Sequence, residues 1–151
     1  MAPLVSTIEI ARHPEEVFSY VTDPSRFVTW QENILNGSMD GDHRPRVGSR
    51  CITTRRIGFA ERKITSEITA IDPPRKWSVH GIDGSIRAVV NVTVDPVDGK
   101  RRSRVTIALD FEGYGIGRLL VPLFVRREAR REMPKNLRRL KERLESRENA
   151  P

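Results

Sequence analysis

The sequence contains few cysteine, histidine and aromatic residues, and it has no long hydrophobic run. Of its 151 residues, one is cysteine, three are histidine and 6% are aromatic. The single cysteine, Cys51, excludes an internal disulfide, a cysteine-based zinc site and a Cys-x-x-Cys redox pair. No apolar run approaches the roughly 18–20 residues that a membrane-spanning helix needs. We therefore expect neither a metal site nor a bound cofactor.

The N-terminus also lacks the features of a secretory signal. Met1–Ala11 has no basic segment ahead of an apolar stretch, and from Leu4 onward it alternates like a strand. We therefore expect no signal peptide and a cytoplasmic location. A chain of this length has the size of one domain, 1–151, which buries about 69% of its unfolded surface and needs no disulfide or metal to support its core.

The positive charge of the chain is concentrated near its C-terminus. Lysine and arginine total 27 against 20 aspartate and glutamate, which gives a net charge of +7. Residues 116–148 carry 11 basic and 5 acidic side chains, so a net +6 lies there. With so few aromatic residues to stack on bases, we expect no nucleic-acid binding. Arg126, Arg127, Arg130 and Arg131 form either a solvated helix edge or a weak contact with anionic membranes.

The N-terminal part predicts one strand followed by two short helices. Leu4–Ala11 alternates apolar and polar residues, as in a strand with one buried face. His13-Pro14 and Asp23-Pro24 mark two helix starts, because proline suits the first turn and aspartate is a good cap. The second helix is expected to end near Trp30. Asn36–Gly48 is rich in glycine, aspartate and proline and has little periodicity, which predicts a loop.

The middle of the chain has the pattern of successive antiparallel strands. Asp83-Gly84 and Asp98-Gly99 are strong signals for hairpin turns. Strands that alternate across such hairpins form an antiparallel sheet with one face toward solvent. The expected strands are Ser49–Ile57, Phe59–Ile71, Lys76–Ile82, Ser85–Val94 and Arg102–Glu112.

A long helix is expected after the last strand. Leu119–Leu144 has apolar residues at intervals of three and four, which is typical of a helix with one buried face. A helix of about thirty residues is about 45 Å long and can cross a whole sheet. Pro134 removes one hydrogen bond within the helix, so we expect a kink near Arg130–Met133. The apolar stripe consists of Met133, Leu137, Leu140 and Leu144.

Three glycines precede this helix. Gly113-x-Gly115-x-Gly117 lies between a strand and a helix, where a dinucleotide-binding motif occurs in other folds. Arg118 stands where the third glycine of that motif belongs, and the strands around it are antiparallel. We therefore exclude dinucleotide binding and interpret the glycines as a flexible link.

The sequence identifies no catalytic residue. His13, His43 and His80 are scattered, and none has metal-ligand spacing from another histidine or a carboxylate. Motifs for a nucleophile elbow, a zinc protease and a P-loop are lacking. By strand parity, His80, Asp110 and Glu112 lie on the face of the sheet that points away from the core.

The order of these elements resembles the START-like (SRPBCC) superfamily, in its polyketide cyclase/dehydrase branch. The segment TIEIARHPEEVFSYVTDPSRFVTW is similar to the opening of that family, and the resemblance extends over nearly the whole chain. Later segments similar to the family are Val47–Arg50, Ile68–Trp77, Ser103–Leu109 and Asn136–Glu145. The matching residues of the opening are Ala11, Pro14, Glu15, Glu16, Val17, Phe18, Asp23, Pro24 and Trp30.

This resemblance implies an α+β, helix-grip (START/Bet v 1-like) fold. A curved antiparallel sheet would wrap around the long C-terminal helix, with two short helices after the first strand and a deep apolar cavity in between. The sequence leaves open the alternative that side chains fill this space. The link at Tyr114 would lie near the cavity mouth. The expected ligand contacts are Trp30, Trp77, Val90, Val92, Ile107, Leu109, Phe111, Tyr114, Leu120, Leu123 and Phe124.

Two functions are compatible with the resemblance. The first is binding or transport of a small hydrophobic ligand, such as a lipid, a sterol or a polyketide-like molecule. The alternative is a polyketide cyclase or dehydratase type of enzyme that acts on a ligand in the same cavity, which needs an acid, base or tyrosine aimed into it. The sequence decides neither between these two nor on the oligomeric state.

Overall fold

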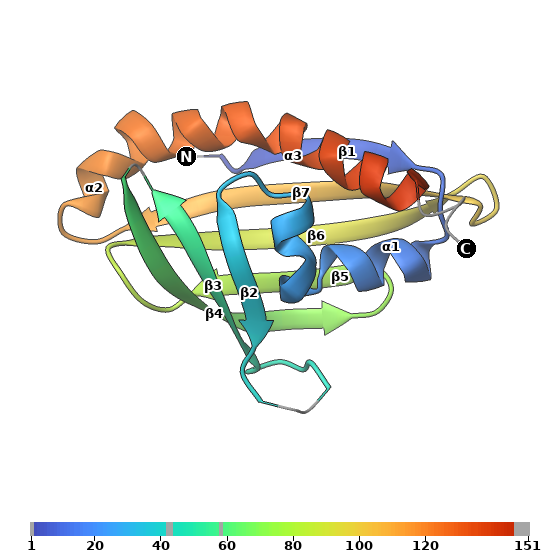
Figure 1. Ribbon diagram of the computed structural model, residues 1–151, viewed down its shortest axis with the longest axis horizontal. Coiled ribbons are helices and arrows are strands. Elements are labelled where there is room, and N and C mark those ends of the chain that lie inside the picture. Colours follow the sequence, from blue (N-terminus) through green and yellow to red (C-terminus); the bar gives the residue numbers. More distant parts are fainter. Residues whose placement is uncertain (1, 42–43, 58, 147–151) are drawn as a thin grey trace.

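A computed structural model describes residues 2–41, 44–57 and 59–146. Within these residues, seven strands form one antiparallel sheet in the order β1-β7-β6-β5-β4-β3-β2. The elements are β1 (Leu4–Ile10), α1 (Pro14–Val21), η1 (Pro24–Thr29), β2 (Ile34–Met39), β3 (Arg50–Ile57), β4 (Ala60–Asp72), β5 (Lys76–Gly81), β6 (Ile86–Val97), β7 (Arg102–Gly113), α2 (Gly117–Leu120), η2 (Val121–Val125) and α3 (Arg126–Ser146). Figure 1 shows the curled sheet with α3 running along β1, which confirms the predicted helix-grip fold.

The two short helices begin where the sequence predicts them. Pro14 occupies the first turn of α1, and the carboxylates of Glu15 and Glu16 lie near the positive end of its dipole. The Asp23 side chain caps η1 by accepting a hydrogen bond from the Ser25 N–H at 3.0 Å. Both helices contribute buried side chains to the core on the concave side of the sheet.

One strand lies where the sequence predicts a loop. Residues 36–39, at the start of the expected loop, belong to β2, which pairs with β3 at the edge of the sheet. Asn36, Gly37 and Ser38 are turn-forming residues with no alternating pattern, so their strand arises from pairing and not from local preference. A bulge between Ile34 and Asn36 further obscures the pattern. His43 falls outside the described residues.

The C-terminal helical segment has an irregular turn ahead of the position where the sequence predicts a kink. Helix α3 continues through Pro134 from Arg126 to Ser146. The irregularity lies earlier, at η2, where Val121–Val125 forms a π-helical turn that contains Pro122. None of the helices within the described residues has the length and apolar character needed to cross a membrane.

The glycine link ahead of α2 is closely packed at its first and last glycines. A Cβ atom on Gly117 would lie 2.1 Å from the Ser85 carbonyl oxygen, and one on Gly113 would lie 2.4 Å from the Gly117 carbonyl oxygen. The Tyr114 N–H also donates to the Ser85 carbonyl at 2.8 Å. Glycine is therefore required here because α2 approaches the backbone of the β5–β6 connection.

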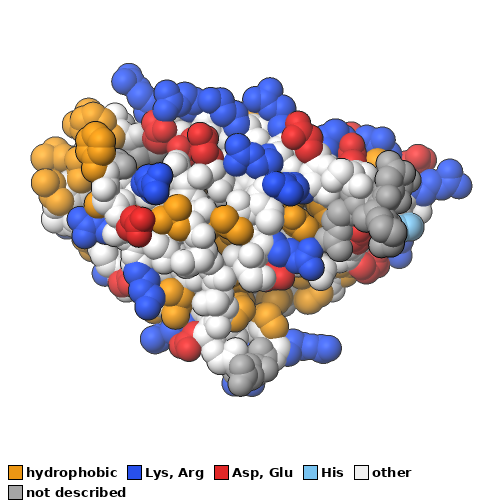
Figure 2. All heavy atoms as spheres, in the orientation of Figure 1, with side chains coloured by type: hydrophobic (Ala, Val, Ile, Leu, Met, Phe, Trp, Pro, Cys, Tyr) orange, Lys and Arg blue, Asp and Glu red, His pale blue; other side chains and the backbone are white. Residues whose placement is uncertain are grey.

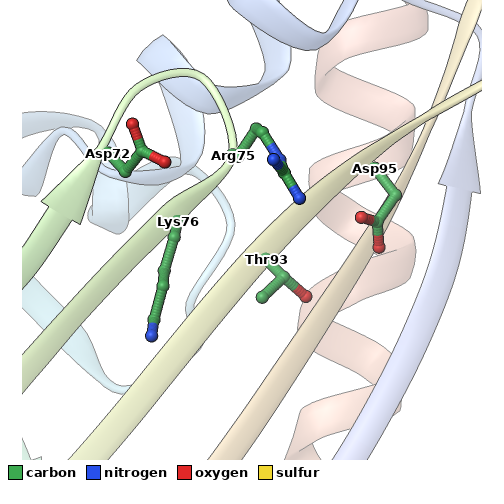
Figure 3. A pocket seen from close by; sticks show the side chains of 5 residues that line it. All are labelled: Asp72, Arg75, Lys76, Thr93 and Asp95. Atoms are coloured by element: carbon green, nitrogen blue, oxygen red, sulfur yellow. The ribbon is translucent and has the colours of Figure 1, made fainter.

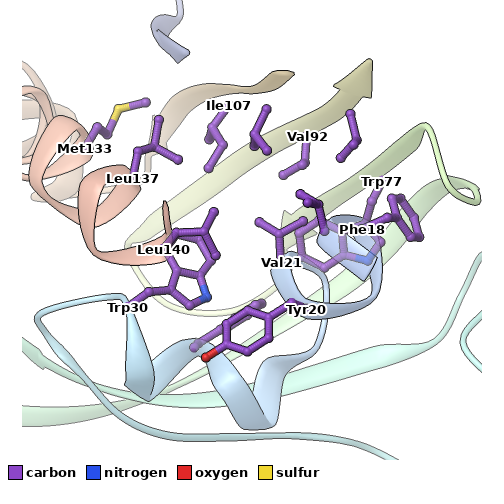
Figure 4. Packing of buried hydrophobic residues seen from close by; sticks show 14 of the residues in the cluster. Phe18, Tyr20, Val21, Trp30, Trp77, Val92, Ile107, Met133, Leu137 and Leu140 are labelled. Carbon is purple, nitrogen blue, oxygen red and sulfur yellow. The ribbon is translucent and has the colours of Figure 1, made fainter. Parts of the chain in front are cut away.

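The hydrophobic core lies between the concave face of the sheet and the C-terminal half of α3. The predicted stripe is confirmed, since Met133, Leu137, Leu140 and Leu144 are all buried (Figure 4). This half of α3 is also held to the start of the chain by polar contacts. Lys141 Nζ donates to the Glu9 carbonyl at 2.8 Å, and Arg12 Nε donates to the Leu144 carbonyl at 2.8 Å.

Candidate functional site

Part of the concave face is apolar but incompletely covered. Strands β6 and β7 pair Val90 with Leu109 and Ala88 with Phe111, so these side chains point to the same face as the core. Farther along the same strands, toward α1, the inward-facing side chains are fully buried. At the other end of these strands, toward α2, the inward-facing side chains are only half-buried. We call this half-buried surface the trough, and it consists of Ile86, Ala88, Val90, Leu109 and Phe111.

Two hollows on the described surface lie away from the trough. One of about 370 Å³ is bounded by α1 and η1, from Glu15 to Arg26. The other, of about 170 Å³, lies where β4, β5 and β6 meet and is lined mainly by charged side chains such as Asp72 and Arg75 (Figure 3). Neither lies between the sheet and α3. The deep cavity that the resemblance implies is therefore not one of these two hollows, and the trough is a partly covered apolar surface on the concave face.

A cluster of polar side chains joins the β2–β3 side of the sheet to α3. Arg55 has the strand parity of the inward-facing Thr53, and its Nη2 donates to Gln31 Oε1 at 3.3 Å. Asn33 Nδ2 donates to Glu132 Oε1 of α3. We call Gln31, Asn33, Arg55 and Glu132 the polar cluster.

Burial shifts the pKa of both charged members of the polar cluster in the direction that favours the uncharged form. Burial lowers the pKa of the Arg55 guanidinium, and the nearby Glu132 carboxylate opposes this effect. Burial also raises the pKa of Glu132, and the neighbouring Glu128 adds to the rise. Such a pair can donate a hydrogen bond to a ligand oxygen and, through Glu132, exchange a proton.

Trp30 provides a further donor on the concave side. Its side chain is 4% exposed, and among the described residues no acceptor bonds to its Nε1. The Trp30 ring packs edge-on against Phe27, which also contacts Trp77 edge-on. Figure 4 shows Trp30 beside Leu140. A buried donor without an acceptor costs about 1–3 kcal/mol, so an oxygen atom placed there would be bound favourably.

The expected ligand contacts fall into three groups. Trp30, Trp77, Val92 and Ile107 are buried in the core. Val90, Leu109 and Phe111 line the trough, and Leu120 is half-buried in α2. Tyr114, Leu123 and Phe124 are 42, 58 and 63% exposed.

The C-terminal segment thus corrects two expectations. Leu123 and Phe124 were expected to contact a ligand between the sheet and the helix, but they point to solvent, as Leu119 does, because Gly117 and Val121 occupy the inner face of this segment. Arg126 was expected on an exposed basic edge, but it is 7% exposed. Its guanidinium donates to Asp110 Oδ1 at 2.7 Å and to the Ala2 carbonyl at 2.6 Å.

His80 and Glu112 lie on the outer face of the sheet, as strand parity predicts. His80 Nε2 bonds to Glu112 Oε1, and both side chains are about two-fifths exposed. Tyr114 donates to the other oxygen of Glu112 at 3.5 Å, and the Arg87 guanidinium lies 4.3 Å from the Tyr114 ring centroid. Among the described residues, no group of three histidine, cysteine, aspartate or glutamate side chains is placed to hold a metal ion.

Sequence reasoning missed the polar cluster entirely. Gln31 and Asn33 follow the second helix without any recognisable motif, and Arg55 has a second arginine beside it at position 56. Glu132 precedes the buried Met133 by one residue, so its helical position alone suggests a solvated edge. The one available signal was the parity of Arg55 with Cys51 and Thr53 along β3.

Comparison with protein families gives one match over nearly the whole chain. Residues 1–145 match the family model described as polyketide cyclase / dehydrase and lipid transport. The sequence matches no curated protein.

Solved structures with similar folds include an aromatase/cyclase and a START superfamily protein. The Zhui aromatase/cyclase from Streptomyces sp. R1128 has a TM-score of 0.80 at 12% identity, over 98% of this chain and 96% of its own. A START superfamily protein from Mycobacterium smegmatis has a TM-score of 0.77 at 16% identity, over 97% and 99%. The protein TTHA0849 from Thermus thermophilus has a TM-score of 0.75 at 17% identity, over 95% and 97%. At these identities the similarity shows the fold alone.

Proposed function

Because the chain belongs to the polyketide cyclase/dehydrase and lipid transport family, we propose that it binds a small hydrophobic molecule in the trough. The observation that carries this proposal is the change in burial along β6 and β7. Val92 and Val105 are 2 and 0% exposed, whereas the inward-facing residues toward α2 are left half-buried. Apolar side chains that face the inside of a fold and are only partly covered are typical of a ligand site.

The polar groups on the concave side of the sheet suggest which ligand fits. An apolar skeleton would contact Val90, Leu109 and Phe111, and an oxygen atom would accept a hydrogen bond from Arg55 or from Trp30 Nε1. A lipid, a sterol and a polyketide-like molecule all combine these two features. The expected contacts Tyr114, Leu120, Leu123 and Phe124 belong to the link and the helical turns at the α2 end of this site, where a ligand would enter.

The proposal can be tested with two identical substitutions on opposite faces of the sheet. Ala88 faces the trough opposite Phe111, and Ala108 faces outward opposite Asn91. Ala88→Phe should fill the trough and weaken binding of the fluorescent apolar probe N-phenyl-1-naphthylamine by about tenfold or more, whereas Ala108→Phe should leave it within about twofold. Equal effects of the two variants, or no binding by the native protein, would contradict the proposal.

A second observation favours an enzyme of the cyclase or dehydratase type. Glu132 is a partly buried acid with a raised pKa, and it lies near the Arg55 guanidinium. In such a reaction the Glu132 carboxylate would take a proton from a carbon between two carbonyls, and Arg55 would stabilise the enolate oxygen. The enolate carbon would then bond to a second carbonyl carbon, whose oxygen would receive the proton from Glu132.

The enzymatic alternative has its own test. Glu132→Gln removes the titratable group and should abolish cyclised product from a poly-β-ketone substrate while probe binding stays within about twofold. Glu142→Gln, on the exposed side of the same helix, is the matched control and should change neither. If Glu132→Gln forms product at the native rate, the enzymatic role is rejected and the binding proposal stands.

A further inference from the structure

A patch of large apolar side chains is exposed on the short helical segment ahead of α3. Ile116, Leu119, Leu123 and Phe124 are 67, 66, 58 and 63% exposed, and we call them the apolar patch. Figure 2 shows hydrophobic side chains gathered at the end of the molecule where Figure 1 draws α2. Single exposed apolar residues need no explanation, but a contiguous group at one end of a molecule does.

The polarity of this segment is the reverse of that expected for a helix that packs on a sheet. Its inner side is formed by the buried Gly117 and Val121, with Gly117 packed against the Ser85 backbone. Its outer side carries the apolar patch, at spacings that follow one helical face. A helix covering a sheet normally has polar residues on its outer side, so the core does not explain the apolar patch.

Cationic side chains border the apolar patch. Arg118, Arg127 and Arg130 are exposed, and none of them forms an ion pair with a carboxylate of the described residues. Arg131 is exposed as well and pairs with Glu128 at 2.7 Å. Figure 2 shows lysine and arginine side chains continuing from the patch along the outer edge of α3. This end of the molecule is therefore both apolar and positively charged.

We propose that the apolar patch docks the protein on an anionic lipid bilayer. The four side chains would enter the interface between headgroups and acyl chains, while Arg118, Arg127 and Arg130 would lie against the lipid phosphates. Protruding apolar residues flanked by arginine are the features that bind a helix at a membrane surface. A stable protein interface buries about 800 Å² on each partner, more than four side chains on two helical turns provide.

The position of α2 gives this docking a consequence for the trough. Gly117 packs against the Ser85 backbone, and a Cβ atom added to it would lie 3.5 Å from the side chain of Ile86, a trough residue. Helix α2 therefore borders the trough at its half-buried end. A protein docked through the apolar patch would hold that end beside the bilayer. The docking itself does not depend on the identity of the ligand.

Vesicle flotation with the full chain tests the proposal. The native protein should float with vesicles of phosphatidylcholine and phosphatidylserine, and much less with phosphatidylcholine alone. Leu123→Ser with Phe124→Ser should reduce the bound fraction at least about tenfold, and Arg127→Glu about fivefold. Val5→Ser and Arg143→Glu alter an exposed apolar and an exposed basic residue elsewhere, and they should bind like the native protein.

Two readouts separate insertion from the alternatives. Phe124→Trp should shift its fluorescence emission to shorter wavelength on anionic vesicles, because the indole enters an apolar environment. Absence of flotation, or equal loss with Arg127→Glu and Arg143→Glu, would overturn the proposal. So would a concentration-dependent dimer in sedimentation that Leu123→Ser with Phe124→Ser abolishes, since the apolar patch would then bind a second copy.

Discussion

The two halves of the C-terminal helical segment use the same residue types in opposite ways. In α3, Leu137, Leu140 and Leu144 are 2, 0 and 0% exposed and pack in the core. Ahead of it, Leu119 and Leu123 are 66 and 58% exposed. The first group lies on the helix that packs against β1 and η1, whereas the second belongs to the turns that border the half-buried trough.

This difference separates the part of the molecule that provides stability from the part that we propose to bind ligand and membrane. Buried leucines and the hydrogen bonds from Lys141 and Arg12 fix the C-terminal half of α3 to the sheet. The α2 and η2 turns bury few side chains and contain a π-helical turn, a feature frequent at functional sites. Regions with little burial open most easily, so we expect the α2 end to be the more dynamic.

Truncating a leucine in each half gives the largest expected contrast. Leu140→Ala removes a fully buried side chain and should lower the free energy of unfolding by about 2–5 kcal/mol. Leu123→Ala removes an exposed one and should change it by less than about 0.5 kcal/mol. Urea denaturation followed by circular dichroism measures both. Similar losses in the two variants would show that the exposed half also contributes to the core.

The close packing of α2 predicts the next largest effect. Gly117→Ala places a Cβ atom against the Ser85 backbone and should destabilise the protein by about 1–3 kcal/mol. Gly115→Ala is the comparison, because that residue has a φ of 57° but no atom within 4 Å of an added Cβ. Its cost should be about 1 kcal/mol, from backbone strain alone. A smaller loss for Gly117→Ala than for Gly115→Ala would contradict the packing argument.

Two glutamates, one in each half of α3, should affect stability with opposite pH dependence. Burial acts to raise the pKa of Glu145, but hydrogen bonds from Lys141 and the Ala11 N–H, together with nearby positive charge, lower it below its ordinary 4.5. Its stabilising effect is therefore complete above pH 4.5 and is lost as the pH falls through the lowered pKa. Burial raises the pKa of Glu132 above 4.5, so its destabilising effect is absent below pH 4.5 and complete above the raised pKa.

Unfolding of the two glutamine variants across this pH range checks the signs. At pH 7, Glu145→Gln should be less stable than the native protein, and Glu132→Gln should be at least as stable. Both differences should shrink as the acids become protonated below their folded-state pKa values. A destabilised Glu132→Gln at neutral pH would show that the contact of Glu132 with Asn33 outweighs the burial of its charge.

The smallest expected effect concerns the single cysteine. Burial raises the pKa of the Cys51 thiol to about 11, so little thiolate is present at pH 8. Labelling by 5,5′-dithiobis(2-nitrobenzoate) should be slow in the native protein and complete in urea. Rapid native labelling would show that the buried face of β3 opens to solvent more readily than its burial suggests.

Much of the architecture follows from local pattern in the sequence. The alternation of β6 and β7, the hairpin at Asp98-Gly99 and the apolar stripe of α3 each have a short-range cause. Edge strand β2 has none, because its turn-forming residues Asn36 and Gly37 are extended only through pairing with β3. A pattern search within one segment cannot detect such a strand.

The candidate site was less predictable than the fold. Strand parity correctly identified Val90, Leu109 and Phe111 as inward-facing. It gave no sign that Arg55 and Glu132, separated by 77 positions in the chain, would lie near each other. Periodicity also failed on Leu123 and Phe124, because it shows that a helix has an apolar face but not what that face contacts.

The sequence by itself determined the order of the elements, the alternation of the strands and the concentration of basic residues near the C-terminus, because each depends on neighbouring residues. The tertiary structure alone decided which surfaces are covered. Burial of Arg126 against Asp110, exposure of the apolar patch and the half-buried trough all depend on contacts between distant segments. Solvent exposure is set by how these segments pack, and no local pattern specifies it.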